Sequence, residues 1–482
     1  MPTLADRVIS REDPRCDHHD AIESGSMDTN NSLYRPPAPH PYTEGTGDFD
    51  GVETNLLRHL PEELYKADIV DISTAEQPNY LINDPDLISV IFEEKPEIFV
   101  KAEGMIELLR PLLGDHPIVT SNNRCVDQRD MIRPIGTMRT QQVNFEHIQN
   151  SINRFEDYCE EIQNENRVID LSLLLRRLNA DIAYRMLFSN ELPTDVFNEI
   201  NSHARDFEKR ISQVIRETAE QGVAWQLPKL PQTAMYAAQQ LRYLVSMLID
   251  GNIQHNSFSH HSFLHKFLIA RSPETNIPFT RKQIVDHVTT ILNSQELAAA
   301  ALMWAFFVLS QCPEAKQKIR EEVSKVGGQD DIQFEQLSRL RYTRNVFREI
   351  LRLYPPIPHL TRRASRPIKL GKLDLQEGAQ ITVSPWIVHR HQQYWFNPDR
   401  FDPERYMRKD QHIIMKSFLP FGRGLRMCTG ASSAILQGTL ILANLVTRFD
   451  IDILNADKVE PEGVLFLEPT RPIVCKVTPL RS

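Results

Sequence analysis

A ten-residue segment, FGRGLRMCTG at positions 421–430, constrains this chain more than any other feature. It surrounds one cysteine, Cys428, with an aromatic ring, glycines and a cation at fixed spacing. Phe421 precedes the cysteine at a distance where its ring can pack against the sulfur and shield it. Gly424 and Gly430 permit turns and close approach that a Cβ would block, and Arg426 supplies a fixed cation suited to a carboxylate. Such a loop can hold a thiolate that binds a metal, with backbone N–H groups directed at the sulfur.

An isolated cysteine is usually an inert, small apolar side chain. Several specified positions within ten residues argue against that reading here. The pattern F-x-x-G-x-R-x-C-x-G resembles the cysteine-ligand loop of the cytochrome P-450 family of haem-thiolate monooxygenases. The resemblance implies that Cys428 is the axial ligand of a haem iron. It also implies that Arg426 binds a haem propionate and that Phe421, Gly422 and Gly430 belong to the cofactor site. The chain contains no C-x-x-C-H attachment sequence, so the expected cofactor is haem b, iron protoporphyrin IX.

A glutamate and two arginines form a second recognisable group. In FREILRLYPPIP, Glu349 and Arg352 lie three residues apart on a predicted helix, so they share one face and can pair. Most such pairs are solvated surface bridges of little worth. The apolar residues around this pair indicate burial instead, and a buried pair requires further partners. Arg405, in FDPERY, is the expected third member. The arrangement looks like the structural triad of the P-450 family, which braces the fold behind the haem.

Two further arginines are candidates for the haem propionates. Arg129, in CVDQRDMIRP, matches the arginine of the family's W-x-x-x-R pattern. Cys125 stands where the family has tryptophan, which removes one N–H donor from this contact. Arg362, which follows the turn at Pro355-Pro356, is the second candidate.

The resemblance places the oxygen-activating segment on a predicted helix over residues 281–311, about 45 Å long at the usual rise per residue. The family pattern A/G-G-x-D/E-T matches Asn293-Ser294-Gln295-Glu296-Leu297. The acid is present as Glu296. Leu297 occupies the threonine position, and leucine can neither donate nor accept a hydrogen bond. The candidate catalytic residues are therefore Glu296, Gln295 and Ser294.

Three interpretations of Leu297 remain open at this point. In the first, a hydroxyl of the substrate, or a water held by Ser294, Gln295 or Glu296, completes the proton relay. In the second, the enzyme uses a peroxide, rearranges its substrate, or abstracts hydrogens to form a ring or a bond. In the third, the alignment is wrong by one turn and Leu297 faces the core.

The resemblance also implies a substrate pocket. Ile357 and His359 should lie over the haem, together with Leu297, Leu465 and Ile118. Most of these side chains would form an apolar wall. His359 can hydrogen-bond a carbonyl or hydroxyl of the substrate, and it can equally bond a backbone carbonyl or a propionate.

Composition is that of a large soluble enzyme. The chain has 482 residues, a net charge of −9 and no basic run, which argues against a nucleic-acid partner. Its six cysteines are scattered, as in a protein of the reducing cytosol. Residues 1–52 are polar and predicted to be largely disordered, without a membrane anchor. Residues 53–482 lack a flexible linker and are predicted to form one domain.

Amphipathic periodicity predicts helices over residues 145–165, 168–190, 195–221, 231–254, 281–311, 312–326, 342–354 and 431–448. Short strands are predicted near 68–83, 366–384 and 473–479, with Gly371 and Gly378 as turns. Periodicity alone gives a mainly α protein with small β-sheets. The resemblance names the expected architecture as the P-450 fold, a triangular α-rich prism that encloses the haem.

These expectations describe a soluble, cytoplasmic, monomeric enzyme of bacterial type. It would oxidise a small, largely apolar metabolite, in secondary-metabolite biosynthesis. The alternatives are a P-450-fold isomerase, a peroxide-using or bond-forming enzyme, and a non-catalytic haem sensor or carrier.

A fused reductase domain is not expected after Cys428, so electrons are expected from an external NAD(P)H-linked ferredoxin or flavoprotein reductase. Basic residues before the cysteine loop are predicted either to steer this acidic partner or to form a solvated face: Arg405, Arg408, Lys409, Lys416 and Arg423.

Overall fold

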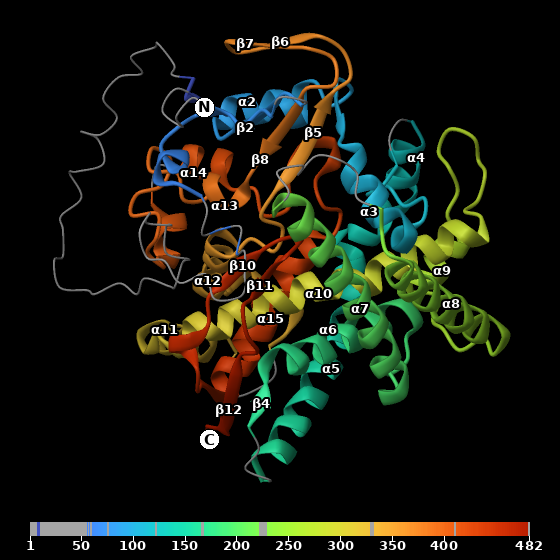
Figure 1. Cartoon of the computed structure of the whole chain (residues 1–482). Helices are drawn as coiled ribbons and strands as arrows, with labels where there is room; N and C mark the ends of the chain where they lie inside the picture. The colour runs from blue at the N-terminus through green and yellow to red at the C-terminus, as the bar shows by residue number, and fades with distance from the viewer. Residues whose placement is uncertain are drawn as a thin grey trace.

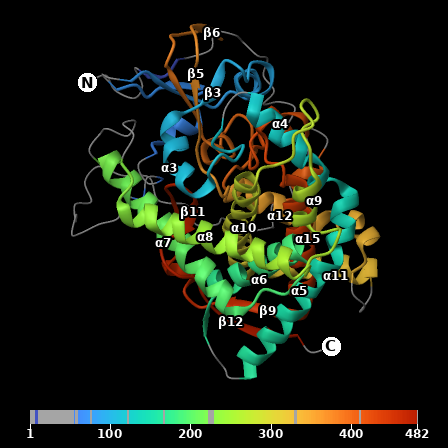
Figure 2. The same ribbon diagram turned by 90° about the vertical axis from the view of Figure 1, so that its right-hand side faces the viewer.

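The computed structural model describes residues 7–9, 55, 57, 60–74, 77–120, 123–164, 168–220, 229–327, 332–408 and 411–480. Most of segment 1–52 lies outside these residues. The described residues 7–9 belong to segment 1–52 and pair with the strand at Ile69–Val70. Val8 forms a β-bridge with Val70, and the N–H of Ile9 donates to the carbonyl of Ile69. The largest sheet lies at one end of the molecule and a smaller sheet at the other, and helices fill most of the space between them (Figures 1 and 2).

Helices dominate the described chain. The α-helices are α2 (Pro85–Ser89), α3 (Glu103–Leu113), α4 (Asn123–Ile132), α5 (Met138–Asn164), α6 (Leu171–Phe188), α7 (Thr194–Glu220), α8 (Gln232–Gln254), α9 (Phe263–Ile269), α10 (Arg281–Ser310), α11 (Pro313–Gly327), α12 (Arg341–Leu353), α13 (Pro385–Val388), α14 (Gln411–Ser417) and α15 (Ala431–Arg448). Short 3-10 or π turns are η3 (Glu62–Tyr65), η4 (Val90–Glu94), η5 (Arg133–Gly136), η6 (Phe334–Arg339), η7 (Pro403–Met407), η8 (Gly424–Arg426) and η9 (Ala456–Lys458).

Four small sheets complete the fold of the described residues. The largest has the strand order β1-β2-β8-β5-β3, in which β2 and β8 are parallel and the other neighbours are antiparallel. The order β4-β12-β9 forms a second sheet at the opposite end of the molecule (Figure 1), and β6-β7 and β10-β11 are hairpins. The strands are β1 (Ile69–Asp71), β2 (Asn79–Ile82), β3 (Phe99–Lys101), β4 (Ile169–Asp170), β5 (Leu360–Ala364), β6 (Ile368–Leu370), β7 (Leu373–Leu375), β8 (Gln380–Val383), β9 (Phe449–Ile453), β10 (Pro461–Gly463), β11 (Leu467–Pro469) and β12 (Val474–Pro479).

The prediction of a mainly α protein with small sheets is confirmed. All eight predicted helices are present, with ends that differ by a few residues except at the start of α5, which begins at Met138. Sequence periodicity missed the shorter helices α2, α3, α4, α9, α13 and α14, and the strands β3, β4, β5, β9, β10 and β11, which have two to five residues each. Such short elements contain too few residues to show a period.

The long helix α10 crosses the centre of the molecule (Figure 1). It starts at a capping box, in which the Thr280 hydroxyl and the Gln283 amide satisfy each other's backbone N–H groups. Within the described residues, α10 is the one helix long and apolar enough to cross a membrane. In its most apolar stretch of 18 residues, 56% is buried inside the protein. A helix buried in the core of a large protein is apolar on most of its sides, and this accounts for the composition of α10.

Two apolar cores meet at the cysteine loop. The larger core lies among the helices, and the smaller one packs beneath the five-stranded sheet. Leu419 belongs to the sheet-side core, whereas Phe421 packs against the helical core. The loop that carries Cys428 is therefore held from both sides before it enters α15.

Candidate functional site

The cysteine loop is fixed by backbone geometry. The N–H of Cys428 donates to the carbonyl of Phe421 at 2.9 Å. Gly422 and Gly424 have φ of +68° and +67°, a region that favours glycine. A Cβ on Gly424 would lie 2.0 Å from the carbonyl oxygen of Phe92 in η4, so this glycine allows the loop to pack against the neighbouring turn. Gly430 differs, because its φ is −89° and its Cβ would meet the Cys428 sulfur at an ordinary 3.8 Å.

The Cys428 side chain is accessible, as an axial ligand must be, although the atoms crowded around the sulfur desolvate its thiolate. This desolvation raises the pKa of the Cys428 thiol, and the backbone N–H of Gly430 and the charge of Arg129 act against it. A metal cation at the sulfur would deprotonate the thiol outright. Gly430 and Arg129 would then stabilise the resulting thiolate.

Four cationic side chains gather beside this loop. They are Arg129 of α4, Arg362 of β5, Arg426 of η8 and Lys101 of β3, the last of which sequence analysis missed. Burial, with repulsion from Arg426, Arg362 and Arg129, lowers the pKa of Lys101 to about 8. Burial and Arg426 lower the pKa of Arg362 to about 9. Lys101 stands in no motif of its own, so only the folded chain identifies it.

An anionic group fits among these cations. Nη1 of Arg426 is buried without a hydrogen-bond partner among the described residues, and a buried donor left unpaired is costly. The two propionates of a haem carry negative charge to set against Lys101, Arg129, Arg362 and Arg426, and they offer an acceptor for Nη1 of Arg426. The cysteine thiol and the cation cluster thus suit the same cofactor, one at its metal and the other at its carboxylates.

Cys125 stands where a tryptophan was expected, and its side chain makes a hydrogen bond of its own. Its buried thiol donates to the carbonyl of Pro117 at 3.4 Å. Nζ of Lys101 donates to the same carbonyl and to that of Thr120, and lies 4.0 Å from the Cys125 sulfur. Lys101 therefore supplies a cationic donor beside the position where the indole N–H is missing.

The three polar candidates on α10 have different surroundings. The Ser294 hydroxyl is exposed and donates to the carbonyl of Ile291 at 2.8 Å. The Gln295 amide donates weakly to the same carbonyl, and its Oε1 is buried without a partner among the described residues. Glu296 accepts a hydrogen bond of 2.6 Å from Nε of Arg176 on α6. Leu297 is half-buried.

The predicted pocket residues come partly together. The N–H of Leu467 on β11 donates to the carbonyl of Pro356, which brings the segment of Leu465 beside that of Ile357 and His359. Burial lowers the pKa of His359 to about 4, so its imidazole is neutral at physiological pH. Ile118 is 48% exposed, and its N–H donates to Nδ1 of the buried His116.

The triad is a fully buried cluster. Glu349 pairs with Arg352 at 2.8 Å and with Arg405 at 2.9 Å, and none of the three side chains is more than 2% exposed. Arg352 also donates to the carbonyls of His389, Pro398 and Arg400, so its charge is completely solvated by the protein.

The basic group before the cysteine loop is not one surface patch. Including Arg405 in it was wrong, because Arg405 is buried on Glu349. Arg423 is only 15% exposed and lies near Glu93. Arg408 and Lys416 are exposed but paired with Asp402 and Asp86. Lys409 lies outside the described residues.

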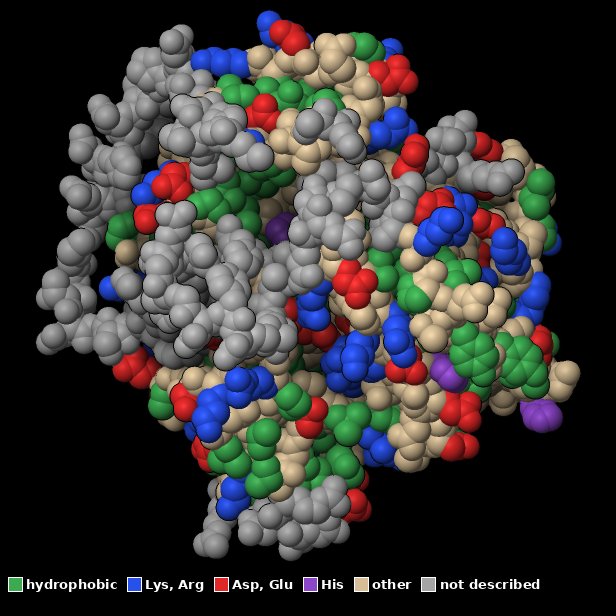
Figure 3. All heavy atoms as spheres, in the orientation of Figure 1, with side chains coloured by type: hydrophobic (Ala, Val, Ile, Leu, Met, Phe, Trp, Pro, Cys, Tyr) green, Lys and Arg blue, Asp and Glu red, His purple; other side chains and the backbone are tan. Residues whose placement is uncertain are grey.

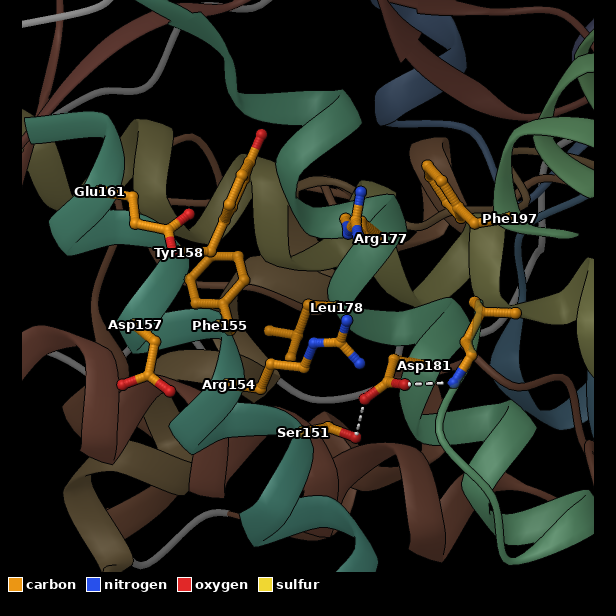
Figure 4. A pocket seen from close by; sticks show the side chains of 11 residues that line it. Ser151, Arg154, Phe155, Asp157, Tyr158, Glu161, Arg177, Leu178, Asp181 and Phe197 are labelled. Carbon is orange, nitrogen blue, oxygen red and sulfur yellow. Dashed lines mark hydrogen bonds between the residues drawn. The ribbon is translucent and has the colours of Figure 1, made fainter. Parts of the chain in front are cut away.

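A separate cavity of about 400 Å³ lies between α5, α6 and the start of α7. Figure 4 shows Asp181 in its wall, accepting hydrogen bonds from Ser151 and from the N–H of Leu192. Arg177 stands within 6 Å of the ring centroids of Tyr158 and Phe197. None of the predicted site residues lines this cavity, so it does not compete with the cysteine loop as the place of the chemistry.

Comparisons with known proteins agree with this geometry. The family model for cytochrome P-450 matches residues 52–477. Cyclooctatin synthase of Streptomyces melanosporofaciens is 28% identical over 86% of this chain and 88% of that protein. Cyclooctat-9-en-7-ol 5-monooxygenase of the same organism is 27% identical over 86% and 90%. A plant relative, 11-oxo-beta-amyrin 30-oxidase of Glycyrrhiza uralensis, is 34% identical over 37% of this chain and 35% of its own length. The chain therefore belongs to the cytochrome P-450 family and is a haem-dependent monooxygenase that receives electrons from an external donor.

Proposed function

We propose that this protein hydroxylates a small, largely apolar metabolite that carries a hydroxyl of its own, in secondary-metabolite biosynthesis. The observation that carries the proposal is Leu297 on α10, at the position where the resemblance expects a threonine: Leu297 provides no hydroxyl there. A relative of similar length is named for oxygenating cyclooctat-9-en-7-ol, a name that denotes an unsaturated alcohol. A substrate alcohol would supply the missing hydroxyl.

The cofactor in this proposal is haem b, with Cys428 as its axial ligand. Lys101, Arg129, Arg362 and Arg426 would hold its propionates, which supply the acceptor that the buried Nη1 of Arg426 lacks. When bound, the thiolate-ligated haem supplies O–O cleavage, with electrons from an NAD(P)H-linked ferredoxin or flavoprotein. The wall of Ile357, Leu465 and Ile118 would exclude water and orient the apolar body of the substrate.

Protons then reach the reaction along α10. The Ser294 hydroxyl is already used on the Ile291 carbonyl, so it is a poor replacement for threonine. The unpartnered Oε1 of Gln295 can accept a hydrogen bond from a water or from the substrate hydroxyl. Glu296 would hold the proton that this hydroxyl passes on.

Leu297 also favours a second candidate function. A site that lacks the usual alcohol can work with a peroxide, or can rearrange or couple its substrate, because these reactions place different demands on proton delivery. With a peroxide as the oxidant, or with a rearrangement that needs no oxidant, this candidate predicts turnover without an electron donor.

Labelled oxygen separates the two candidates. The haem-loaded protein is incubated with a reductase system, NADPH and ¹⁸O₂, and with pairs of polycyclic alcohols and their deoxy analogues. The proposal expects ¹⁸O in the product of the alcohol and poor coupling of electrons to product with the deoxy partner. Product formed from peroxide alone, with no dependence on the substrate hydroxyl, would support the second candidate. Tight ligand binding with no turnover under any condition would point to a haem sensor or carrier.

A further inference from the structure

Five charged side chains from four elements meet beside α10. Glu296 belongs to α10, Arg176 to α6, Arg205 and Glu208 to α7, and Glu468 to β11. We call this group the acid cluster. In Figure 3, acidic and basic side chains also lie next to one another over the region of α7. Apart from the acid on α10, none of these residues stands in a recognisable sequence motif.

The members of the acid cluster are linked by direct contacts. Nε of Arg176 lies 2.6 Å from Oε2 of Glu296, and its Nη2 lies 3.5 Å from Oε1 of Glu468. Nη1 of Arg205 contacts the same Glu468 oxygen and lies 2.9 Å from Oε2 of Glu208. Glu468 thus joins the two arginines, and the chain of contacts runs from α10 to α7.

The cluster contains more acids than bases. Among the described residues, Glu208, Glu296 and Glu468 form ion pairs only with Arg176 and Arg205, which leaves one negative charge unbalanced when every carboxyl is ionised. The neighbouring Glu462, opposite Glu468 in the hairpin, is balanced by Arg216. An unbalanced charge is costly in a buried group, and binding a proton removes it.

The surroundings of the individual acids agree with this count. The Glu208 side chain is 9% exposed, and burial together with the charge of Glu468 raises the pKa of Glu208 to about 8. Burial also raises the pKa of Glu296, although Arg176 and Arg205 oppose the shift.

Solvent reaches the acid cluster at one edge. The side chains of Arg205 and Glu468 are 35% and 32% exposed. Those of Arg176 and Glu296 are only 16% and 15% exposed. The edge formed by Arg205 and Glu468 can therefore exchange protons with water, whereas Glu296, within the proposed oxygen-activating segment of α10, lies at the sheltered end.

We infer that Glu208, Glu296 and Glu468 share one proton at neutral pH, and that this proton is the one Glu296 supplies on the substrate side of α10. When the proton leaves, the cluster gains one negative charge. A proton taken up from water at the Arg205–Glu468 edge restores the original state, and no electron or heavy atom moves. The use of the proton rests on the proposed function, but its presence does not.

Infrared spectroscopy of the haem-loaded, substrate-free protein tests the shared proton. A protonated carboxyl has a carbonyl stretch that shifts in D₂O, and this band should disappear as the pH rises through about 8. Replacing any one of the three acids by glutamine leaves as many acids as arginines. The band should therefore be lost at neutral pH in Glu208→Gln, in Glu468→Gln and in Glu296→Gln. Three independent variants keep the test valid if one of them folds poorly.

Glu462→Gln is the matched control. Glu462 lies opposite Glu468 in the register of the β10-β11 hairpin, but its carboxylate is balanced by its own ion pair with Arg216 on α7. The control should keep the band. No titrating band in the wild-type protein, or a band that survives in all three cluster variants, overturns the inference.

Turnover assays separate this inference from the proposed function. A band that behaves as expected in a protein that oxygenates no alcohol supports the shared proton and rejects the proposed function. Normal oxygenation of an alcohol without the band rejects the shared proton and leaves the proposed function intact. If both hold, Glu208→Gln and Glu468→Gln should lower the fraction of electrons that appear in product, and Glu462→Gln should not. Unchanged coupling in both cluster variants would show that the proton is not used.

Discussion

Arg129 donates a hydrogen bond of 2.6 Å to the carbonyl oxygen of Met427, the residue immediately before Cys428. This contact ties α4 directly to the cysteine loop. It is made where the expected tryptophan of α4 is replaced by Cys125, whose neighbour in space is Lys101. The loss of an indole donor is thus accompanied by a lysine and an arginine that both reach the region of the cofactor.

Lys101 should make haem binding depend on pH. Its pKa is lowered to about 8 without an anionic partner, and bound propionates would raise it. Haem then binds the protonated lysine more tightly, so affinity should be constant below about pH 8 and should fall as the pH rises further. Spectroscopic haem titrations of wild type and Lys101→Met measure this. The variant should bind haem more weakly at neutral pH and lose the pH dependence. The exposed Lys66→Met is the control, and equal slopes in all three proteins would contradict the assignment.

Removing Glu349 should destabilise the fold. Arg352 and Arg405 would become uncompensated buried cations, at a cost of about 3–5 kcal/mol. Glu349→Ala should therefore show a lower melting temperature and poor haem incorporation. Glu62→Ala, which breaks an exposed pair with Lys66, should leave both unchanged. A Glu349→Ala protein that melts like wild type would show that the triad is not needed for stability.

Leu297→Thr should have opposite effects with two substrates. For an analogue that lacks the hydroxyl, the new threonine restores a donor, so the fraction of electrons recovered in product should rise. For the alcohol itself the relay is already complete, and the change should be small. Glu296→Gln should slow both reactions, because it removes the ionisable group while keeping its shape. The idea fails if peroxide-driven turnover is indifferent to both substitutions.

Glu208 should weaken the fold as the pH rises. Its pKa is about 8 in the folded protein, against an ordinary value of 4.5 for a solvated glutamate. Between these values the unfolded chain has released a proton that the folded chain retains, so the free energy of unfolding falls with increasing pH. Chemical denaturation of wild type and Glu208→Gln across this range measures the difference. The wild type should lose stability relative to the variant from about pH 4.5 to 8, and parallel profiles would be incompatible with the raised pKa.

Local patterns in the sequence were enough for the long helices and the cysteine loop. Helices such as α7 and α15 repeat apolar residues over many turns, so their periodicity is visible. The turn at Gly424 depends on the positive φ of this glycine, and the space next to the Phe92 carbonyl leaves no room for a Cβ there.

Contacts between distant segments could not be predicted in this way. Nothing in the local sequence distinguishes Lys101 from other lysines. It can be identified only because β3 places it beside Arg129 and Arg426 in the folded chain. Glu296 was identified from its motif, but its partner Arg176 comes from another helix and Glu468 from a hairpin far along the chain. From the sequence alone, Arg405 could belong to a basic surface or to a buried triad. The burial of its side chain in the folded protein assigns it to the triad.

The most direct test of the whole account is the absorption spectrum of the reduced protein under carbon monoxide. The haem-loaded wild type should show the long-wavelength Soret band typical of thiolate ligation, and Cys428→Ala should lose it. Cys125→Ala, which alters a buried thiol next to Lys101, should keep it. Loss of the band in Cys125→Ala together with its retention in Cys428→Ala would contradict the assignment of Cys428 as the haem ligand.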